Sequence, residues 1–217
     1  MKIKHRMLTG FIGLFFAVIM PIAQAESLDI FIKDKEGQPV KDAVVALMPG
    51  SAIDYNQMPT AIMDQREKMF DPRVLAIRVN TQVRFPNSDD VRHHVYSFSP
   101  AKKFELRLYH GLTAEPIVFD QAGKVVLGCN IHDSMIGYIY VLNTEYFAKS
   151  DASGKLTINN IPAGGYQLEL HHPDLRDDYP VEKIQITSGA AQQKVLVVNN
   201  LSGSIPVKDV GEFDNLF

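Results

Sequence analysis

The sequence predicts an all-β protein. Leu28, Ile30 and Ile32 alternate with polar neighbours, which places them on one face of a strand. Short apolar runs recur along most of the chain after this point. Clusters of Asn, Asp, Ser, Pro and Gly separate these runs and mark turns. Many short strands at this spacing are typical of a β-sandwich or a β-barrel.

The expected strands follow one another from the first alternating stretch to the end of the apolar pattern. They are Leu28–Ile32, Val40–Leu47, Val74–Val79, Val83–Phe85, Val95–Phe98, Phe104–Tyr109, Ile117–Phe119, Val125–Leu127, Ile136–Leu142, Leu156–Ile158, Tyr166–Leu170, Ile184–Ile186 and Val195–Val198. The stretch Tyr55–Phe70 fits the pattern least well. We expect a short helix or a loop there.

The first 25 residues have the features of a cleaved secretory signal peptide. A basic start (Lys2, Lys4 and Arg6) precedes an apolar run over residues 7–22, and small residues follow at the cleavage positions in Ala23-Gln24-Ala25. The run is shorter than a typical transmembrane helix, and its flanking residues do not fit one. We therefore expect export to the periplasm and no stable membrane insertion. A retained membrane anchor is the alternative.

The charge balance argues against a nucleic-acid-binding role. The chain has 22 basic and 25 acidic residues, which gives a net charge of −3. Removal of the signal peptide takes away three basic residues and leaves 19 against 25, a net charge of about −6. A mildly acidic chain has no general electrostatic attraction for phosphates.

Cys129 is the only cysteine, so it cannot form a disulfide within the chain. In an oxidising compartment an unpaired thiol is a liability unless it is buried or bound. It begins the motif Cys129-x2-His132-x2-Met135, which places three possible metal ligands in one loop between two expected strands. A thiolate, two imidazoles and a distant thioether form the ligand set of a blue-copper electron-transfer site.

Other metals and cofactors fit this motif less well. Zinc prefers more cysteines or histidines. Haem attachment requires Cys-x-x-Cys-His, which is absent from the sequence. A fourth copper ligand must come from elsewhere in the fold, and His93 or His94 can supply it. Strand alternation leaves the choice open, because both faces of a sandwich strand can carry apolar residues.

Residues from about 70 to 142 resemble a cupredoxin of the plastocyanin, amicyanin and pseudoazurin kind. The resemblance is carried by FDPRVLAIRVNTQVRFPNSDD, RHHVYSFS and FDQAGKVVLGCNIHDSMIGYIYV. It implies a Greek-key β-sandwich with one type 1 copper site, whose metal ligands are His93, Cys129, His132 and Met135. In the family a residue that ties the ligand loops together, usually Asn, follows the first ligand histidine. His94 occupies that position here and remains the alternative ligand.

The two ends of the chain resemble a second family, the transthyretin-like or carboxypeptidase-regulatory-like β-sandwich. Its first half is similar to IFIKDKEGQPVKDAVVALMP at residues 30–49, and its second half is similar to DASGKLTINNIPAGGYQLELHHP at residues 151–173. We therefore expect a discontinuous outer sandwich over 26–50 and 143–200, a cupredoxin-like domain inserted at 51–142, and a C-terminal tail over 201–217. Tandem domains are the alternative.

The cupredoxin resemblance implies a one-electron carrier and not an enzyme. Its expected partner is a periplasmic redox protein such as a cytochrome c or a dehydrogenase. The alternative is a periplasmic copper-binding protein that stores, senses or delivers copper without a redox partner. Multicopper oxidases and nitrite reductases need additional His-x-His pairs, which are absent from the sequence. His171 and His172 are expected to close a strand of the outer sandwich.

Overall fold

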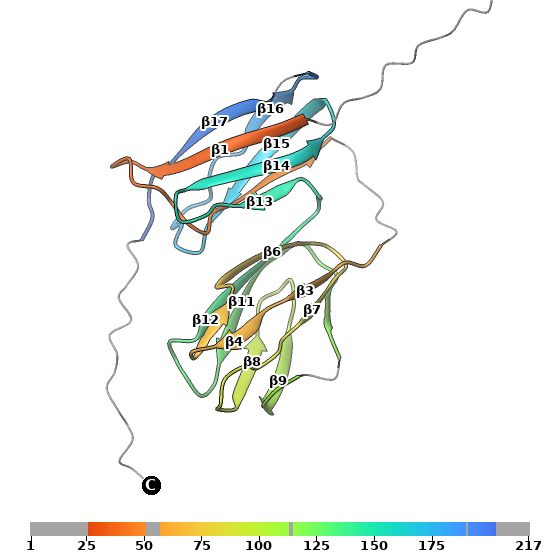
Figure 1. Ribbon diagram of the computed structural model, residues 1–217, viewed down its shortest axis with the longest axis vertical. Helices are drawn as coiled ribbons and strands as arrows, with labels where there is room; N and C mark the ends of the chain where they lie inside the picture. Colours follow the sequence, from red (N-terminus) through yellow and green to blue (C-terminus); the bar gives the residue numbers. More distant parts are fainter. Residues whose placement is uncertain (1–25, 51–56, 113–114, 190, 203–217) are drawn as a thin grey trace, which may run out of the picture.

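The computed structural model describes residues 26–50, 57–112, 115–189 and 191–202, and all regular structure in these ranges is β (Figure 1). The prediction of an all-β protein is confirmed. None of the described residues belongs to a helix that could cross a bilayer. The predicted signal peptide (1–25) lies outside the described residues, as does the predicted tail after Ser202.

Seventeen strands are distributed over the described ranges. They are β1 (Glu26–Asp34), β2 (Val44–Pro49), β3 (Thr60–Ile62), β4 (Asp64–Arg66), β5 (Met69–Asp71), β6 (Val74–Arg78), β7 (Thr81–Arg84), β8 (His93–Ser97), β9 (Phe104–Tyr109), β10 (Ile117–Phe119), β11 (Gly123–Cys129), β12 (Ile136–Leu142), β13 (Phe147–Lys149), β14 (Lys155–Ile161), β15 (Gly164–His171), β16 (Glu182–Ile186) and β17 (Gln192–Val198).

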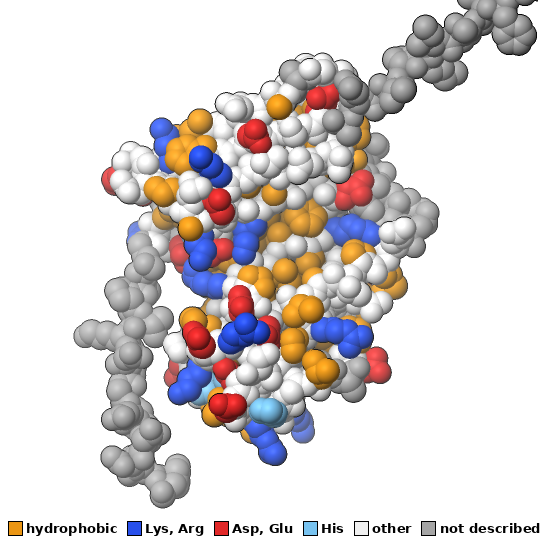
Figure 2. Space-filling view, in the orientation of Figure 1, with side chains coloured by type: hydrophobic (Ala, Val, Ile, Leu, Met, Phe, Trp, Pro, Cys, Tyr) orange, Lys and Arg blue, Asp and Glu red, His pale blue; other side chains and the backbone are white. Residues whose placement is uncertain are grey.

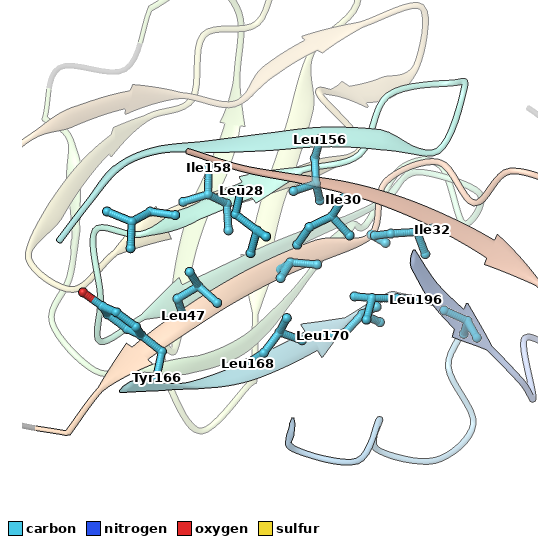
Figure 3. Packing of buried hydrophobic residues seen from close by; sticks show 14 of the residues in the cluster. Leu28, Ile30, Ile32, Leu47, Leu156, Ile158, Tyr166, Leu168, Leu170 and Leu196 are labelled. Carbon is cyan, nitrogen blue, oxygen red and sulfur yellow. The ribbon is translucent and has the colours of Figure 1, made fainter. Parts of the chain in front are cut away.

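The first sandwich combines strands from both ends of the chain. One sheet has the order β14-β1-β17, and the other has the order β13-β2-β15-β16. Alternate residues of β1 point inward, and Leu28, Ile30 and Ile32 are nearly inaccessible to solvent. Figure 3 shows them packed against residues of β2, β14, β15 and β17, among them Leu47, Leu168 and Leu196.

The second sandwich is built from the middle of the chain. Its larger sheet has the order β6-β12-β11-β8-β9, and its smaller sheet has the order β10-β7-β3. The hairpin β4-β5 forms a separate two-stranded sheet. The core of this sandwich contains Met63, Phe70, Ile77, Val83, Phe85, Val95, Ala101, Phe119, Val125, Leu127, Cys129, Met135, Ile139 and Val141.

A buried seam joins the two sandwiches. In Figure 2 apolar side chains form a band between the upper and lower halves of the molecule, and acidic and basic side chains are interspersed around it. The seam contains Val44 and Ala46 of β2, Val74 of β6, and Tyr140 and Leu142 of β12. Because its other face packs into the first sandwich, β2 has apolar residues at every position from Val44 to Leu47.

The sheet memberships fit the insertion expected from the sequence. β1 and β2 share sheets with β13–β17, whereas β3–β12 pair only among themselves in the sheets of the described residues. The domain boundaries at 26–50, 51–142 and 143–200 stay a prediction. Leu201 and Ser202, assigned to the tail, contact the body: Leu201 bridges to Leu175, and the Ser202 amide donates to the Asp174 carbonyl at 2.8 Å.

The prediction of a short helix or loop over Tyr55–Phe70 is wrong for the residues that the structure describes. β3 and β4 lie wholly within this stretch, and β5 begins at Met69. Met63, Gln65 and Phe70 are buried, so the stretch contributes to the core. The buried glutamine interrupts the apolar alternation that would have predicted β4.

His172 follows β15 and is only 8% exposed. Its Nδ1 accepts a hydrogen bond from the Asp174 amide at 3.1 Å, so its Nε2 carries the proton and donates to the Lys41 carbonyl at 3.0 Å. Burial is the main cause that lowers the pKa of His172, against an opposing effect of the Lys41 contact. The neutral ring therefore joins the end of β15 to the segment before β2.

We predict that the metal-free protein loses stability as the pH falls below about 6.5, because an unfolded histidine takes up a proton at a higher pH than folded His172. His172→Gln should reduce this loss, because glutamine does not titrate. Urea unfolding between pH 7.5 and 5.5 measures it, with exposed His110→Gln as the matched control. An equal pH dependence in the wild type and both variants would contradict the prediction.

Candidate metal centre

Two neighbouring strands of the larger sheet bring the predicted ligands together. β8 begins at His93 and β11 ends at Cys129, and the two strands pair antiparallel with Cys129 opposite Val95. His132 lies in the loop that leads from β11 to β12. Residues remote in sequence therefore meet because their strands are neighbours in one sheet.

His93, Cys129 and His132 form a compact cluster. One potential ligand atom from each lies within 4.8 Å of the other two. The Cys129 sulfur is 3.7 Å from His93 Nδ1, and the two imidazole rings stand edge to face with centroids 5.0 Å apart. His93 and Cys129 are buried, while His132 is partly exposed. Within the described ranges, no other group of three His, Cys, Asp or Glu side chains has such a spacing.

His94 lies on the opposite face of β8. The burial of β8 alternates strictly, with His93, Val95 and Ser97 inside. His94 Nε2 lies 3.0 Å from the Glu105 carboxylate, at ion-pair distance but without the alignment of a hydrogen bond. The structure thus brings His93, and not His94, to Cys129. The assignment of His93 as a ligand stays a prediction.

Met135 belongs to the same buried core as Cys129 and is 1% exposed. Its amide donates to the His132 carbonyl at 3.0 Å, which closes a turn between the two residues. Both Met135 and Cys129 line a groove of about 460 Å³ between Tyr96 and Ile136. Met135 therefore shares its groove with Cys129, which in turn belongs to the cluster with His93 and His132.

The donor set fits a soft or borderline metal ion such as copper. A thiolate and two imidazoles are available in a largely buried space, with a thioether nearby. His132 Nδ1 is buried and has no hydrogen-bond partner among the described residues, which leaves its lone pair unused. Burial lowers the pKa of His132, and the neutral form is the one that binds metals.

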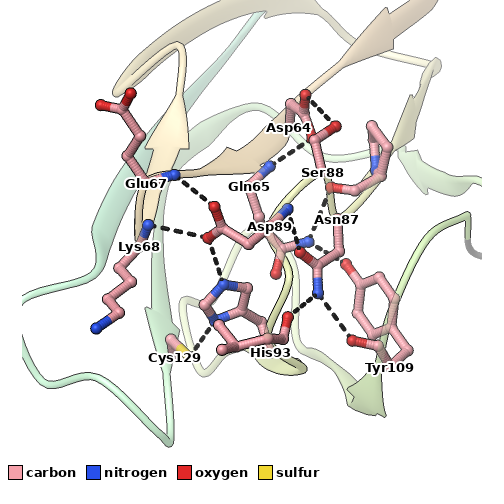
Figure 4. Close-up of polar contacts among 12 residues, drawn as sticks. Asp64, Gln65, Glu67, Lys68, Asn87, Ser88, Asp89, His93, Tyr109 and Cys129 are labelled. Atoms are coloured by element: carbon pink, nitrogen blue, oxygen red, sulfur yellow. Dashed lines mark hydrogen bonds and ion pairs between the residues drawn. The ribbon is translucent and has the colours of Figure 1, made fainter.

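Asp89 contacts the far side of the His93 ring (Figure 4). Its Oδ2 is 2.7 Å from His93 Nε2 and accepts a hydrogen bond from the Lys68 amide at 2.9 Å. Its Oδ1 accepts from the Glu67 amide at 2.6 Å. Burial acts to raise the pKa of Asp89, but the hydrogen bonds outweigh it and hold the pKa below its usual value.

Asn87 ties the loop before β8 to its neighbours. Its side-chain amide donates to the carbonyls of Val91 and Tyr109, both at 2.9 Å, and its Oδ1 accepts from the Asp89 amide at 3.0 Å. Asn87 is 3% exposed, and its side chain makes three hydrogen bonds to the backbone of the loop and of β9. The loop is therefore bound internally without help from a metal.

Tyr109 and Gln65 extend the hydrogen-bond network of Asp89 and Asn87. The Tyr109 hydroxyl donates to the Phe85 carbonyl at 2.7 Å and accepts from the Gln65 amide group. Burial is the main cause that raises the pKa of Tyr109 to about 12, so its hydroxyl stays protonated. Sequence reasoning missed Asp89, Asn87, Gln65 and Tyr109 as parts of the site. Asn87 and Asp89 lie in the stretch that ends in FPNSDD, but the sequence pattern indicated no role for them in the site.

Comparison with known proteins gave matches among solved structures only. No protein-family model and no curated protein matches the chain. The chain is similar to a copper-containing nitrite reductase from Thermus scotoductus SA-01, with 24% identity over 42% of this chain and a TM-score of 0.36. The match spans 25% of that enzyme.

Two smaller proteins are similar over nearly their whole length. A reduced amicyanin variant is 17% identical over 46% of this chain and 99% of its own, with a TM-score of 0.35. A purple cupredoxin from Nitrosopumilus maritimus is 22% identical over 39% of this chain and 99% of its own, with a TM-score of 0.33. Because these TM-scores are low, we infer the function of the chain from the geometry of the site itself.

We predict that His93 and His94 differ sharply on substitution. His93→Ala removes a nitrogen that faces Cys129, so a thiolate-to-copper absorption band should be lost or converted to a different spectrum. His94→Ala should keep the band, because His94 points to the other face. Titration with Cu(II), followed by visible absorption, measures both. Loss of the band in His94→Ala alone would move the ligand by one residue.

Proposed function

We propose that this chain is an exported type 1 copper protein that carries single electrons between periplasmic redox partners. The observation that carries the proposal is the cluster of buried Cys129 and His93 with partly exposed His132. Buried Met135 lines the same groove as Cys129. A copper ion held there would supply reversible one-electron chemistry. The sequence motifs support all four residues, and the geometry of the cluster supports His93, Cys129 and His132.

Each residue contributes a distinct property to such a site. The Cys129 sulfur is a strong, soft donor, and His93 presents Nδ1 toward it at 3.7 Å. His132 supplies a neutral imidazole whose Nδ1 has no other partner in the described structure. A thioether such as that of Met135 is a weak donor that tunes the relative stability of the two copper oxidation states.

Burial supports a carrier over a storage or delivery protein. His93 is inaccessible to solvent, and Cys129 and Met135 are 3% and 1% exposed. Handing copper to an acceptor requires incoming ligands to reach these atoms, whereas an electron needs no such opening. His132, the most accessible of the four, offers the shortest approach for a redox partner. A weak and small interface suits such a partner, because it must leave quickly.

One equivalent of Cu(II) should produce an intense visible band from the thiolate of Cys129. Cys129→Ser should abolish the band and leave a folded β-protein, because the sandwich cores do not depend on a metal. Visible absorption and circular dichroism of both proteins measure this. Colour that persists in the serine variant would refute the site assignment.

Voltammetry then separates the two functional classes. A reversible couple with fast self-exchange supports the carrier. A sluggish couple, together with ready transfer of copper to a chelator, would favour storage or delivery.

Met135→Leu should retain copper and colour while the reduction potential rises. A hydrocarbon in place of the thioether removes a weak donor that favours Cu(II). The exchange conserves volume in a buried position, so unfolding free energy should fall by less than about 1.5 kcal/mol. Voltammetry and urea unfolding check the two effects. An unchanged potential would mean that Met135 does not act on the metal.

A further inference from the structure

We propose that Asp89 is a positioning residue for the metal centre, which fixes Nδ1 of His93 as the metal-binding atom. The identity of the metal in this inference rests on the proposed function. The contact between Asp89 and His93 does not depend on it. Asp89 itself lies outside the ligand cluster. It acts through the opposite side of the His93 ring, where its carboxylate meets Nε2 at 2.7 Å.

Both carboxylate oxygens of Asp89 accept hydrogen bonds. Oδ1 takes the Glu67 amide, and Oδ2 takes both the Lys68 amide and His93 Nε2. The two backbone amides can only donate. An ionised carboxylate in this position has only acceptor atoms, so the contact with His93 requires a proton on Nε2. Neutral His93 must then carry its lone pair on Nδ1, which faces Cys129.

The turn that holds Asp89 is rigidly placed. Glu67 and Lys68 have φ values of 55° and 57°, and these left-handed conformations aim their amides at one point. The strands on either side pair from Asp64–Asp71 to Arg66–Met69. The Phe70 side chain of β5 packs against Gly137 of β12. It fills the space that a side chain at position 137 would need, because a Cβ there would lie 2.9 Å from Phe70.

The turn thus links a hairpin remote in sequence to the ligand histidine. Three sets of contacts hold His93 in place. The turn amides bind Asp89, Asn87 accepts a hydrogen bond from the Asp89 amide, and β11, which ends at Cys129, pairs with β8. Outer partners of this kind orient a ligand imidazole and raise its basicity. The imidazole therefore meets an incoming ion already in the binding tautomer.

Asp89→Asn tests the proposal with a matched control. Asparagine provides one acceptor in place of two and turns an amide group toward a donor, so His93 should lose its single tautomer. Cu(II) affinity should fall by about 10- to 100-fold. Asp90→Asn makes the same charge change at the exposed neighbouring residue and should change neither quantity. Competition titration measures the affinity, and ¹⁵N chemical shifts of the imidazole in metal-free protein report the tautomer.

Each result is decisive for the proposal. The wild-type shifts alone are a test: a proton on Nδ1 of His93 in the folded, metal-free protein would overturn it. So would a Cu(II) affinity in Asp89→Asn equal to that of Asp90→Asn. If Asp89→Asn unfolds the hairpin, the wild-type tautomer still decides. A wild-type protein with the expected tautomer but no thiolate band would refute the proposed function and leave the Asp89–His93 arrangement intact.

Discussion

Side-chain alternation along the five-stranded sheet is the constraint on which the rest of the structure depends. β12 sends Ile139 into the core of the second sandwich and Tyr140 into the seam with the first. β8 and β11 follow the same rule, so His93 and Cys129 face inward, while the Tyr96 ring lies over Gly128 on the other face. A register slip of one residue would exchange these faces. It would expose the side chains of His93 and Cys129 and place polar or bulky groups in the seam. One pairing is therefore compatible with the burial of these two residues and with both cores.

This constraint also explains what could be predicted from the sequence. The alternating strands, the loop from Cys129 to Met135 and the mixed origin of the first sandwich follow from local patterns and family resemblance. The family resemblance favoured His93 over His94, but strand alternation alone left the choice open. β8 carries large side chains on both faces, and the pairing with β11 decides which face is inside. Asp89 was hidden for a related reason. Its hydrogen-bond partners, Glu67 and Lys68, precede it by 22 and 21 residues in the sequence.

The turn at Glu67 and Lys68 has an unfavourable backbone conformation that contacts with the surrounding structure stabilise. A left-handed conformation costs about 1–2 kcal/mol for a residue with a side chain, and this turn has two without glycine. Hydrogen bonds to a charged acceptor contribute about 1.5–3 kcal/mol each, so the two bonds to Asp89 are of the size needed to offset the strain. The same carboxylate contacts His93. A turn that would be unfavourable alone is therefore stabilised by the carboxylate that contacts His93.

The seam gives the first sandwich a role in the rigidity of the site. Met135 directly precedes β12, and the far half of β12 is held in the seam by contact with β2 and β6. β11, at the other end of the ligand loop, pairs with both β8 and β12. The loop from Asn130 to Met135 is thus short and fixed at both ends, and the turn from His132 to Met135 constrains it further. Close-packed interiors resist small displacements, so burial of Tyr140 and Leu142 limits the movement of side chains at the opposite end of the same strand. The first sandwich therefore stabilises the loop that contains His132 through β12, the strand that contributes to both cores.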